Sequence, residues 1–497
     1  MSNSATARPL RVAIIGSGPA GVYAADILTK SQEVRGGDVE VSIDLFETYP
    51  APYGLIRYGV APDHPRIKGI VNALHKVLDR GDIRFLGNVT YGRDLTLSDI
   101  RSFYDAVIFS TGAIKDSGLK IPGVELEGSF GGADFVSWYD GHPDVPREWP
   151  LDAKEVAVIG NGNVALDVAR MLSKHAEDLL VTEIPDNVYR GLKASPVTDV
   201  HIFGRRGPAQ VKFTPLELRE LSHSKDVDIV LYPEDFVFDA ASDEAIRTNN
   251  QVKTMVNTLT NWLVEEPSHA DKPASRRLHL HFLHSPVEIV GTDGKVSGMK
   301  FERNELDGTG RARGTGEIVE YPVQAVYRAI GYLGSELPEV EFDAARGVIP
   351  NEAGRVLDTD GKPVPGIFAT GWIKRGPVGL IGSTKGDALE TIGCLLEDRL
   401  SLPKAEKPEE QAVIDLLESR GVQYTSWEGW LKLDAHEMAL GAEYGAEFGA
   451  DGDAERAGSD EGGAFVKRPR VKVVPREDMV SISRGTSAGI SENAHNG

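Results

Sequence analysis

The sequence predicts an α/β protein with two Rossmann-like dinucleotide-binding domains, the second inserted into the first, in a three-layer architecture followed by a C-terminal extension. Two glycine-rich motifs carry this prediction, at residues 16–21 and 160–165, and each follows a short apolar run and precedes a helical pattern. A strand, a tight glycine turn and a helix N-terminus form a pyrophosphate site, because free amide groups and the helix dipole face the anion. Two such sites in one chain indicate two dinucleotides held together.

The elements of the first half alternate between strands and helices. Helices are predicted at 19–30 and 164–175, and an irregular stretch follows the second helix up to residue 196. Short buried strands are predicted at 10–15, 41–46, 83–85, 106–110, 156–159 and 200–203. This alternation is typical of parallel sheets that have helices on both faces.

The second half returns to the first domain. Residues 226–331 are predicted to form an antiparallel meander, and the strand at 323–330 leads back to the first domain. A strand at 365–372, a glycine-rich turn at 376–382 and a helix at 387–400 follow. We therefore expect a first domain of residues 1–113 and 331–402, a second domain of residues 114–330, and an extension of residues 403–497. Within the extension, 441–463 is predicted to be a mobile acidic insertion, and the chain from Ser481 to be disordered.

Composition narrows the function. The chain has 497 residues and a net charge of 54 − 75 = −21, which disfavours nucleic acid and anionic membranes as partners. No apolar run approaches the roughly 20 residues of a membrane helix, so we expect no membrane insertion and a cytoplasmic location. Cys394 is the single cysteine, so neither a redox-active cysteine pair nor a cysteine metal site can form within the chain, and no metal site is predicted.

The first motif predicts a flavin site. Gly16, Gly18 and Gly21 permit the turn and the close approach of the pyrophosphate, and Glu47 ends the next strand, where a carboxylate accepts the ribose hydroxyls. Gly112 follows another strand, where a glycine lets the backbone approach a cofactor. Hydride transfer between a nicotinamide and a flavin is the economical reason to hold two dinucleotides, so we expect FAD here.

The second motif predicts a site for NADP(H) rather than NAD. The strand after it leads to Arg205 and Arg206, at the position where an NAD site has an acidic residue. Two guanidinium groups suit a 2′-phosphate, because they form bidentate, charge-assisted hydrogen bonds with it.

Several segments resemble adrenodoxin-reductase-type ferredoxin–NADP⁺ reductases. They are residues 51–65 (APYGLIRYGVAPDHP), 160–167 (GNGNVALD), 204–208 (GRRGP) and 371–377 (GWIKRGP). The similarity runs from Arg11 to about residue 400 and resumes at 424–434 and 470–473, which resemble the C-terminal extension of bacterial members. The acidic stretch 441–463 matches nothing in the family pattern.

The resemblance implies an FAD enzyme that takes a hydride from NADPH and passes single electrons to a ferredoxin-type iron–sulfur protein. It assigns FAD contacts to Ala20, Glu47, Leu55, Val89, Trp372, Gly379, Leu380 and Ile381. It assigns NADP contacts to Asn161, Gly162, Asn163, Val164, Arg205, Arg206, Glu217 and Gly379. Residues matching His64 and Glu220 line the hydride-transfer site in such enzymes.

Other functions stay open at this point. An NADPH-dependent monooxygenase or diaphorase has the same two sites, and a non-catalytic NADP-binding redox module has at least one of them. A disulfide reductase is disfavoured by the single cysteine. Lys374, Arg375 and Lys385 are candidate contacts for an electron acceptor, or a solvated rim.

Overall fold

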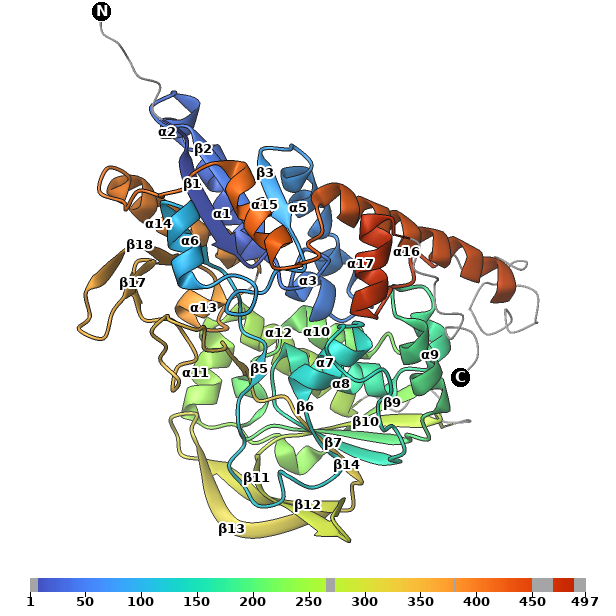
Figure 1. Ribbon diagram of the computed structural model, residues 1–497. Helices are drawn as coiled ribbons and strands as arrows, with labels where there is room; N and C mark the ends of the chain where they lie inside the picture. The colour runs from blue at the N-terminus through green and yellow to red at the C-terminus, as the bar shows by residue number, and fades with distance from the viewer. Residues whose placement is uncertain (1–7, 265–272, 380, 449–467, 487–497) are drawn as a thin grey trace, which may run out of the picture.

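The computed structural model describes residues 8–264, 273–379, 381–448 and 468–486. Its first sheet has the strand order β16-β17-β18-β4-β1-β2-β3 and forms the upper half of the molecule in Figure 1. Its strands are β1 (Leu10–Ile15), β2 (Val41–Phe46), β3 (Ile83–Leu86), β4 (Ala106–Phe109), β16 (Asn351–Glu352), β17 (Arg355–Leu357) and β18 (Pro363–Ala369). β18 pairs in parallel with β4, so strands from both ends of the chain share one sheet. The predicted insertion is thereby confirmed.

Both faces of the first sheet are covered by helices, because successive side chains of a strand point to opposite sides. In β1, Val12 and Ile14 pack with helices α1 (Pro19–Thr29), α5 (Val71–Leu78) and α14 (Ile381–Asp398). Ala13 and Ile15 pack on the other side with α6 (Leu97–Phe103) and α15 (Glu410–Ser419). Cys394 of α14 is buried in the first of these cores.

The second sheet is parallel and has the strand order β6-β14-β7-β8-β10-β9. Its strands are β6 (Ser129–Gly131), β7 (Glu155–Ile159), β8 (Asp199–Phe203), β9 (Val227–Leu231), β10 (Arg276–His281) and β14 (Ala325–Arg328). Val156 and Val158 face the helices α7 (Gly132–Tyr139), α8 (Asn163–Ser173), α10 (Pro215–Leu221) and α12 (Asn250–Val264). Ala157 and Ile159 face an antiparallel sheet of β11 (His284–Thr292), β12 (Lys295–Leu306) and β13 (Ala312–Tyr321).

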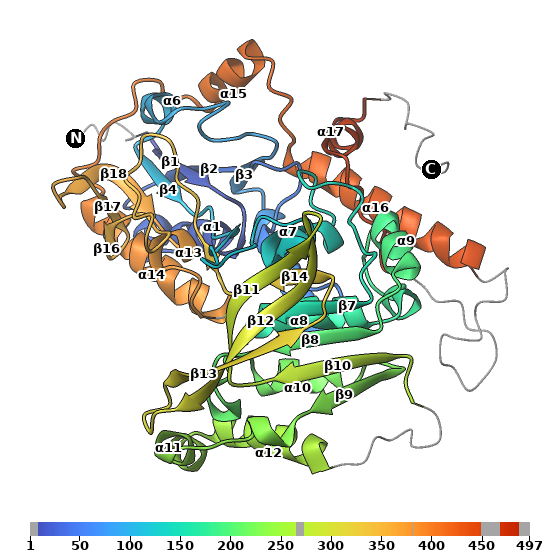
Figure 2. The same ribbon diagram turned by 90° about the horizontal axis from the view of Figure 1, so that it is seen from below.

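Two predictions about this region are wrong. Helices do not cover both faces of the second sheet, since β11–β13 lie across one face, as Figure 2 shows. The segment 226–331 is not a single meander, because β9 and β10 belong to the parallel sheet and α11 (Ala240–Thr248) and α12 lie between them. In β10, Leu278 and Leu280 alternate with His279 and His281. That period-two pattern is typical of a half-exposed strand, but β10 is buried on both faces.

The chain crosses between the two sheets twice. β5 (Lys115–Asp116) leads into the second sheet and β15 (Tyr332–Leu333) leads out of it. The two crossings pair with each other as antiparallel strands. Among the described residues, no helix is long and apolar enough to cross a membrane.

The C-terminal extension adds α15, α16 (Trp427–Phe448) and α17 (Arg476–Arg484), and α16 and α17 lie beside both halves of the molecule in Figures 1 and 2. Three predicted irregular stretches contain helix. Residues 441–448 end α16, residues 481–484 end α17, and α9 (Asp186–Ala194) lies within 176–196, where Val188 and Leu192 bury its apolar face. The remainder of the predicted acidic insertion, and residues 487–497, lie outside the described residues.

Four buried histidines lie between the parallel sheet and β11–β13, on β8, on β10 and at the first residue of β11. They are His201, His279, His281 and His284. The rings of His201 and His279 are stacked 4.2 Å apart, and Nδ1 of His201 is 3.0 Å from Nε2 of His281. Burial lowers the pKa of His201 to about 3 and that of His284 to about 4, and it also lowers the pKa values of His279 and His281. Near-parallel rings cannot all direct a nitrogen lone pair at one ion, so we assign this cluster a structural role.

We expect this cluster to make the fold acid-sensitive. The unfolded chain binds these protons near pH 6.5 and the folded chain does not, so stability is full above that pH. As pH falls from 6.5 toward 4.5, the free energy of unfolding should fall by about 1.4 kcal/mol per pH unit for each proton taken up. Urea unfolding at pH 7.0, 6.0 and 5.0 measures this slope.

The variant His281→Phe keeps a ring stacked between Phe203 and Tyr232, and it removes one proton-binding site. It should reduce the slope, whereas the same change at the exposed His223 should not. Equal slopes in the wild type and His281→Phe would contradict the assignment.

Candidate functional site

The first glycine-rich motif, residues 16–21 (the first fingerprint), forms a tight turn between β1 and α1. Gly16 has a φ of +108°, and a Cβ there would lie 2.6 Å from the carbonyl oxygen of Ser110. A Cβ on Gly21 would lie 2.0 Å from the carbonyl oxygen of Gly16, but one on Gly18 would meet nothing closer than 3.9 Å. No side chain caps α1. The turn therefore requires Gly16 and Gly21, while the space before Gly18 and the first N–H groups of α1 are open to an anion.

Distant segments meet at this turn. A Cβ on Gly371 would lie 2.6 Å from the Cβ of Ala20, which places Trp372, the first residue of α13 (Trp372–Arg375), beside the first fingerprint. Gly54 likewise touches Gly18, so Leu55, the first residue of α3 (Leu55–Tyr58), is also adjacent. The structure thus brings together these residues of the predicted flavin site.

Glu47 follows β2 and points toward the first fingerprint. Its Oε2 accepts hydrogen bonds from the backbone N–H of Ser17 at 2.9 Å and from the Ser17 hydroxyl at 2.8 Å. Burial raises the pKa of Glu47, although the bonds from Ser17 oppose this rise. Val89 donates its N–H to the carbonyl oxygen of Glu47 at 2.9 Å, so Val89 is held against the same turn.

Other predicted flavin contacts lie on two loops. Gly112 follows β4 with a φ of +74°, and nothing lies within 4 Å of a Cβ placed there. Gly379 is exposed in the loop between α13 and α14, and Ile381 is the first residue of α14. Leu380 lies outside the described residues.

The second fingerprint repeats this geometry between β7 and α8. Gly160 has a φ of +146°, and a Cβ there would lie 2.2 Å from the carbonyl oxygen of Ala329. A Cβ on Gly162 would meet nothing within 4 Å, and no side chain caps α8. Oδ1 of Asn163 accepts the N–H of Thr214 at 3.0 Å, which joins the motif to the start of α10. Val164 packs against the core under this sheet.

The loop that carries Arg205 and Arg206 (the arginine loop) lies against the second fingerprint, residues 160–165. A Cβ on Gly204 would lie 2.5 Å from the side-chain nitrogen of Asn161, so Gly204 leaves room for that side chain. The carbonyl oxygens of Arg205 and Arg206 accept hydrogen bonds from Asn304 at 2.8 Å and from Leu283 at 3.2 Å. Within the described part of the chain, neither guanidinium has an ion-pair partner. The loop backbone is therefore fixed while both charges are available to a ligand.

His64 belongs to the domain of the first sheet, but it contacts two helices that pack on the second sheet. Its Nε2 is 2.8 Å from Oδ1 of Asp167 on α8 and 2.8 Å from Oε2 of Glu217 on α10. Burial opposes a charge on the imidazole, but the hydrogen bonds to Asp167 and Glu217 raise the pKa of His64 to about 9. The stability gained from this pairing is full below pH 6.5 and is lost as pH rises through about 9.

A buried arginine completes this cluster. Arg170 binds both carboxylate oxygens of Asp63, at 2.8 and 2.9 Å, and its Nη2 also lies 2.8 Å from Oδ1 of Asp167 and 2.6 Å from Nε2 of His64. His64, Asp167 and Glu217 are close enough to hold a metal ion. The guanidinium of Arg170 already supplies a positive charge to these carboxylates, so we assign no metal ion to this cluster.

Sequence reasoning missed part of this cluster. Asp63, Asp167 and Arg170 were given no role, although Asp63 and Asp167 lie within the motifs that resemble the reductase family. Glu217 was expected at the NADP site, and the structure places its carboxylate against His64. Glu220 lies on the next turn of α10, partly exposed, with Oε2 3.5 Å from Nδ1 of His223. Its place in a hydride-transfer site therefore stays a prediction, and its ion-pair partner in the structure is His223.

One predicted docking residue is unsuited to that role. Lys374 is buried, with Nζ 3.0 Å from Oδ1 of Asp387 and 2.6 Å from Oε2 of Glu390. Its charge is neutralised inside the fold, so it does not present a positive charge to a partner. Arg375 is half-buried and Lys385 is exposed.

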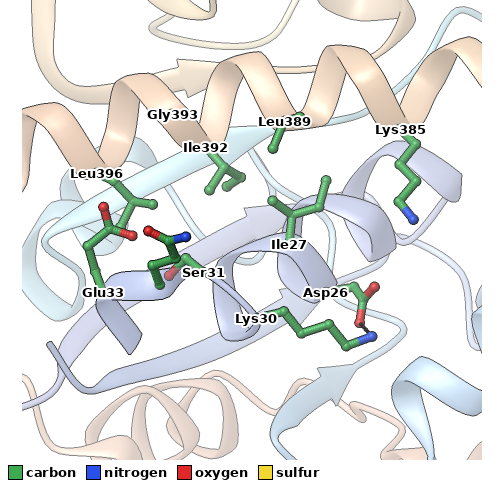
Figure 3. A pocket seen from close by; sticks show the side chains of 11 residues that line it. Asp26, Ile27, Lys30, Ser31, Glu33, Lys385, Leu389, Ile392, Gly393 and Leu396 are labelled. Carbon is green, nitrogen blue, oxygen red and sulfur yellow. Dashed lines mark ion pairs between the residues drawn. The ribbon is translucent and has the colours of Figure 1, made fainter. Parts of the chain in front are cut away.

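A groove of about 480 Å³ lies elsewhere, between α1 and α14 (Figure 3). Ile27, Ile392 and Leu396 line it, and Asp26 and Lys30 form an ion pair at its rim. It lies at the C-terminal end of α1, away from Gly18. The groove is therefore distinct from the predicted nucleotide sites.

Known proteins resemble this chain along nearly its whole length. Residues 10–199 match the family described as pyridine nucleotide-disulphide oxidoreductase. NADPH-ferredoxin reductase FprA of Mycobacterium tuberculosis is 38% identical over 490 residues, covering 96% of this chain and 100% of that protein. Mitochondrial NADPH:adrenodoxin oxidoreductase of Arabidopsis thaliana is 38% identical over 455 residues, covering 89% and 93%.

The solved structures agree with this result. FprA of Mycobacterium tuberculosis in complex with NADPH is 36% identical, superposes with a TM-score of 0.83, and covers 96% of this chain and 100% of that one. The chain is an oxidoreductase that belongs to the family of NADPH-ferredoxin and NADPH:adrenodoxin reductases.

Proposed function

We propose that this protein binds FAD and NADP(H), transfers a hydride from NADPH to FAD, and then passes single electrons to a ferredoxin-type iron–sulfur protein. One observation carries the proposal: Asp167, on the helix that begins at the second fingerprint (the second phosphate turn), binds His64, which belongs to the domain of the first fingerprint (the first phosphate turn). This contact holds the two nucleotide sites in a fixed relation to each other, as hydride transfer requires.

The residues around the first fingerprint fit FAD. Gly18 and the open N-terminus of α1 would receive the pyrophosphate, and Glu47 would receive the ribose. Trp372 and Gly379 would lie near the flavin ring. When bound, the flavin accepts two electrons together and releases them singly. The chain contributes by binding, orienting and shielding the reacting groups.

The residues around the second fingerprint fit NADPH. Gly162 and the N-terminus of α8 would receive the pyrophosphate, and Arg205 and Arg206 would bind the 2′-phosphate. In the same proposal, His64 lies with its Nε2 between Asp167 and Glu217, whose carboxylates favour the protonated imidazole. Because Asp167 and Glu217 neutralise its charge, the role of His64 in this proposal is to hold the turn of residues 63 and 64 against α8 and α10, and so to keep the two nucleotide sites aligned.

The disulfide chemistry in the matched family's description does not fit this chain. Cys394 is the only cysteine, it is buried, and Arg355 donates a hydrogen bond to its sulfur at 3.0 Å. Electrons must therefore leave the flavin for an external acceptor. The identity of that acceptor, a docking surface near Lys385 and the cytoplasmic location are parts of the proposal that rest on the family and the sequence.

The first test is spectroscopic and kinetic. The purified holoprotein should show the visible spectrum of a bound flavin, and NADPH should bleach it anaerobically much faster than NADH does. Cytochrome c reduction should increase when a ferredoxin is added. A colourless protein that cannot be reconstituted with FAD would refute the proposal, and rapid oxygen consumption with no response to ferredoxin would favour a monooxygenase or diaphorase.

A matched pair of glycine variants tests the two phosphate sites. Gly18→Ala and Gly162→Ala each place a methyl group where the protein itself leaves room. Gly18→Ala should weaken FAD binding about 10- to 100-fold, because the methyl group meets the pyrophosphate. Gly162→Ala should raise the KM for NADPH by a similar factor and retain FAD. Flavin content and steady-state kinetics give both results, and each variant is the control for the other.

The arginine pair tests coenzyme choice. The double variant Arg205→Ala, Arg206→Ala should raise the KM for NADPH by at least about tenfold, because two charge-assisted hydrogen bonds to the 2′-phosphate are lost. The KM for NADH, which lacks that phosphate, should change little. A parallel rise in both KM values would refute this assignment.

A further inference from the structure

Arg170, in the last turn of α8, is almost fully buried although it carries a full charge. Its side chain is 1% exposed. Three carboxylates surround it, from Asp63, Asp167 and Glu217, the last with Oε2 3.9 Å from Nη1. Lys174, which caps the C-terminus of α8, also binds Asp63 at 2.6 Å. Arginine is suited to this position, because its planar fork can bind several oxygens at fixed angles.

The charges in this cluster balance when His64 is protonated. Asp63, Asp167 and Glu217 contribute three negative charges, and Arg170, Lys174 and His64 contribute three positive ones. Without Arg170, all three carboxylates would lose a positively charged partner in a buried setting, which is costly. The cluster is therefore organised around the guanidinium.

The contacts of Arg170 also connect the two halves of the molecule. Asp63 and His64 lie in the turn between α3 and α4 (Pro65–Lys68), on the flavin side, and Arg170 and Asp167 lie on α8, which starts at the second phosphate turn. The Arg170 fork binds both oxygens of Asp63, which fixes the direction of the turn as well as its distance. The next residue in that turn is His64.

We propose that Arg170 is a positioning residue for hydride transfer: its bidentate bond to Asp63 holds the turn of His64 on α8 and so fixes the imidazole between Asp167 and Glu217. This inference rests on the proposed function. Arg170 acts through His64 and the alignment of the two nucleotide sites, and it binds neither coenzyme. Its removal should therefore slow the chemical step while leaving the binding of both coenzymes nearly unchanged.

The test measures anaerobic flavin reduction by NADPH in a stopped-flow instrument, from pH 6 to 10, for the wild type, Arg170→Lys and Arg170→Met. Arg170→Met should retain the visible flavin spectrum and a Kd for NADP⁺ within about threefold of the wild-type value, and should lose about 10- to 100-fold in the limiting rate of reduction. Arg170→Lys should recover part of that loss, because an ammonium keeps the charge and loses the fork. The pH profile of Arg170→Met should differ in the alkaline limb, where His64 releases its proton.

Arg276 provides a matched control. It is a buried arginine of β10 that binds the carbonyl oxygens of Ser173 and Lys174 at the end of the same helix, at 3.3 and 2.6 Å. Arg276→Met should leave the limiting rate and the pH profile unchanged. If it lowered the rate as much as Arg170→Met does, the role of Arg170 would be only to stabilise α8, and the proposal would be overturned.

Asp63→Asn keeps the test decisive if Arg170→Met fails to fold, because it weakens the same bond from the flavin side. It should lower the rate in the same way, and a wild-type rate and pH profile in Asp63→Asn or in Arg170→Met would overturn the proposal. The failure of the proposed function is distinguishable from this outcome. In that case the wild-type protein would itself show no flavin reduction by NADPH.

Discussion

The structure depends on a cluster of charges buried between its two halves. Asp63 and His64 come from the part of the chain that builds the first sheet, and Asp167, Arg170 and Glu217 come from helices on the second. A buried charge without a partner costs several kcal/mol, so each member of the cluster requires the others to be in place. The two sheets are therefore held in a defined relation by electrostatic pairing as well as by chain connectivity. The second phosphate turn, residues 160–165, directly precedes Asp167, and Gly54 at the start of α3 contacts Gly18 of the first, so the cluster also constrains the two turns relative to each other.

The C-terminal extension adds a second cluster of the same kind. Nζ of Lys472 lies 2.6 Å from the carbonyl oxygen of Arg57, 3.0 Å from that of Asp140 and 2.9 Å from Oε1 of Glu183. Burial lowers the pKa of Lys472 to about 8, although Glu183 and Asp140 favour the charged form. Lys68 also binds both carboxylates, that of Asp140 at 3.0 Å and that of Glu183 at 2.8 Å. Lys472 of the C-terminal extension thus binds residues of both halves of the molecule, as His64 and Arg170 do at another place. The extension therefore helps to hold the two halves together.

Local signals predicted most of the fold, and contacts across the boundary could not be predicted. Glycine turns, strands and the arginine loop are each encoded within a few residues, so they could be recognised in sequence. Asp167 and Arg170 are three residues apart on a helix and look like an ordinary solvated pair. Glu217 and Glu220 are both glutamates of α10, and the sequence does not show which of them faces His64. That depends on how α10 is rotated about its axis. The strand β10 lies within the stretch 226–331 that was predicted to be a meander; its alternation of leucine and histidine does not show that both faces are buried, because the covering sheet comes from residues further along the chain.

The single cysteine and the buried Lys374 together restrict how electrons can leave the protein. Without a second cysteine, no internal disulfide can carry electrons from a flavin, so the acceptor must approach the cofactor itself. The loop after α13 is the exposed part of this region, with Val378 68% exposed and Gly379 next to it. A net charge of −21 would repel an acidic partner at long range, and Lys374 cannot offset it because Asp387 and Glu390 neutralise it. Recognition of an acidic iron–sulfur protein would then depend on short-range contacts and on the few exposed cations near this loop, which makes association weakly steered and sensitive to local substitutions.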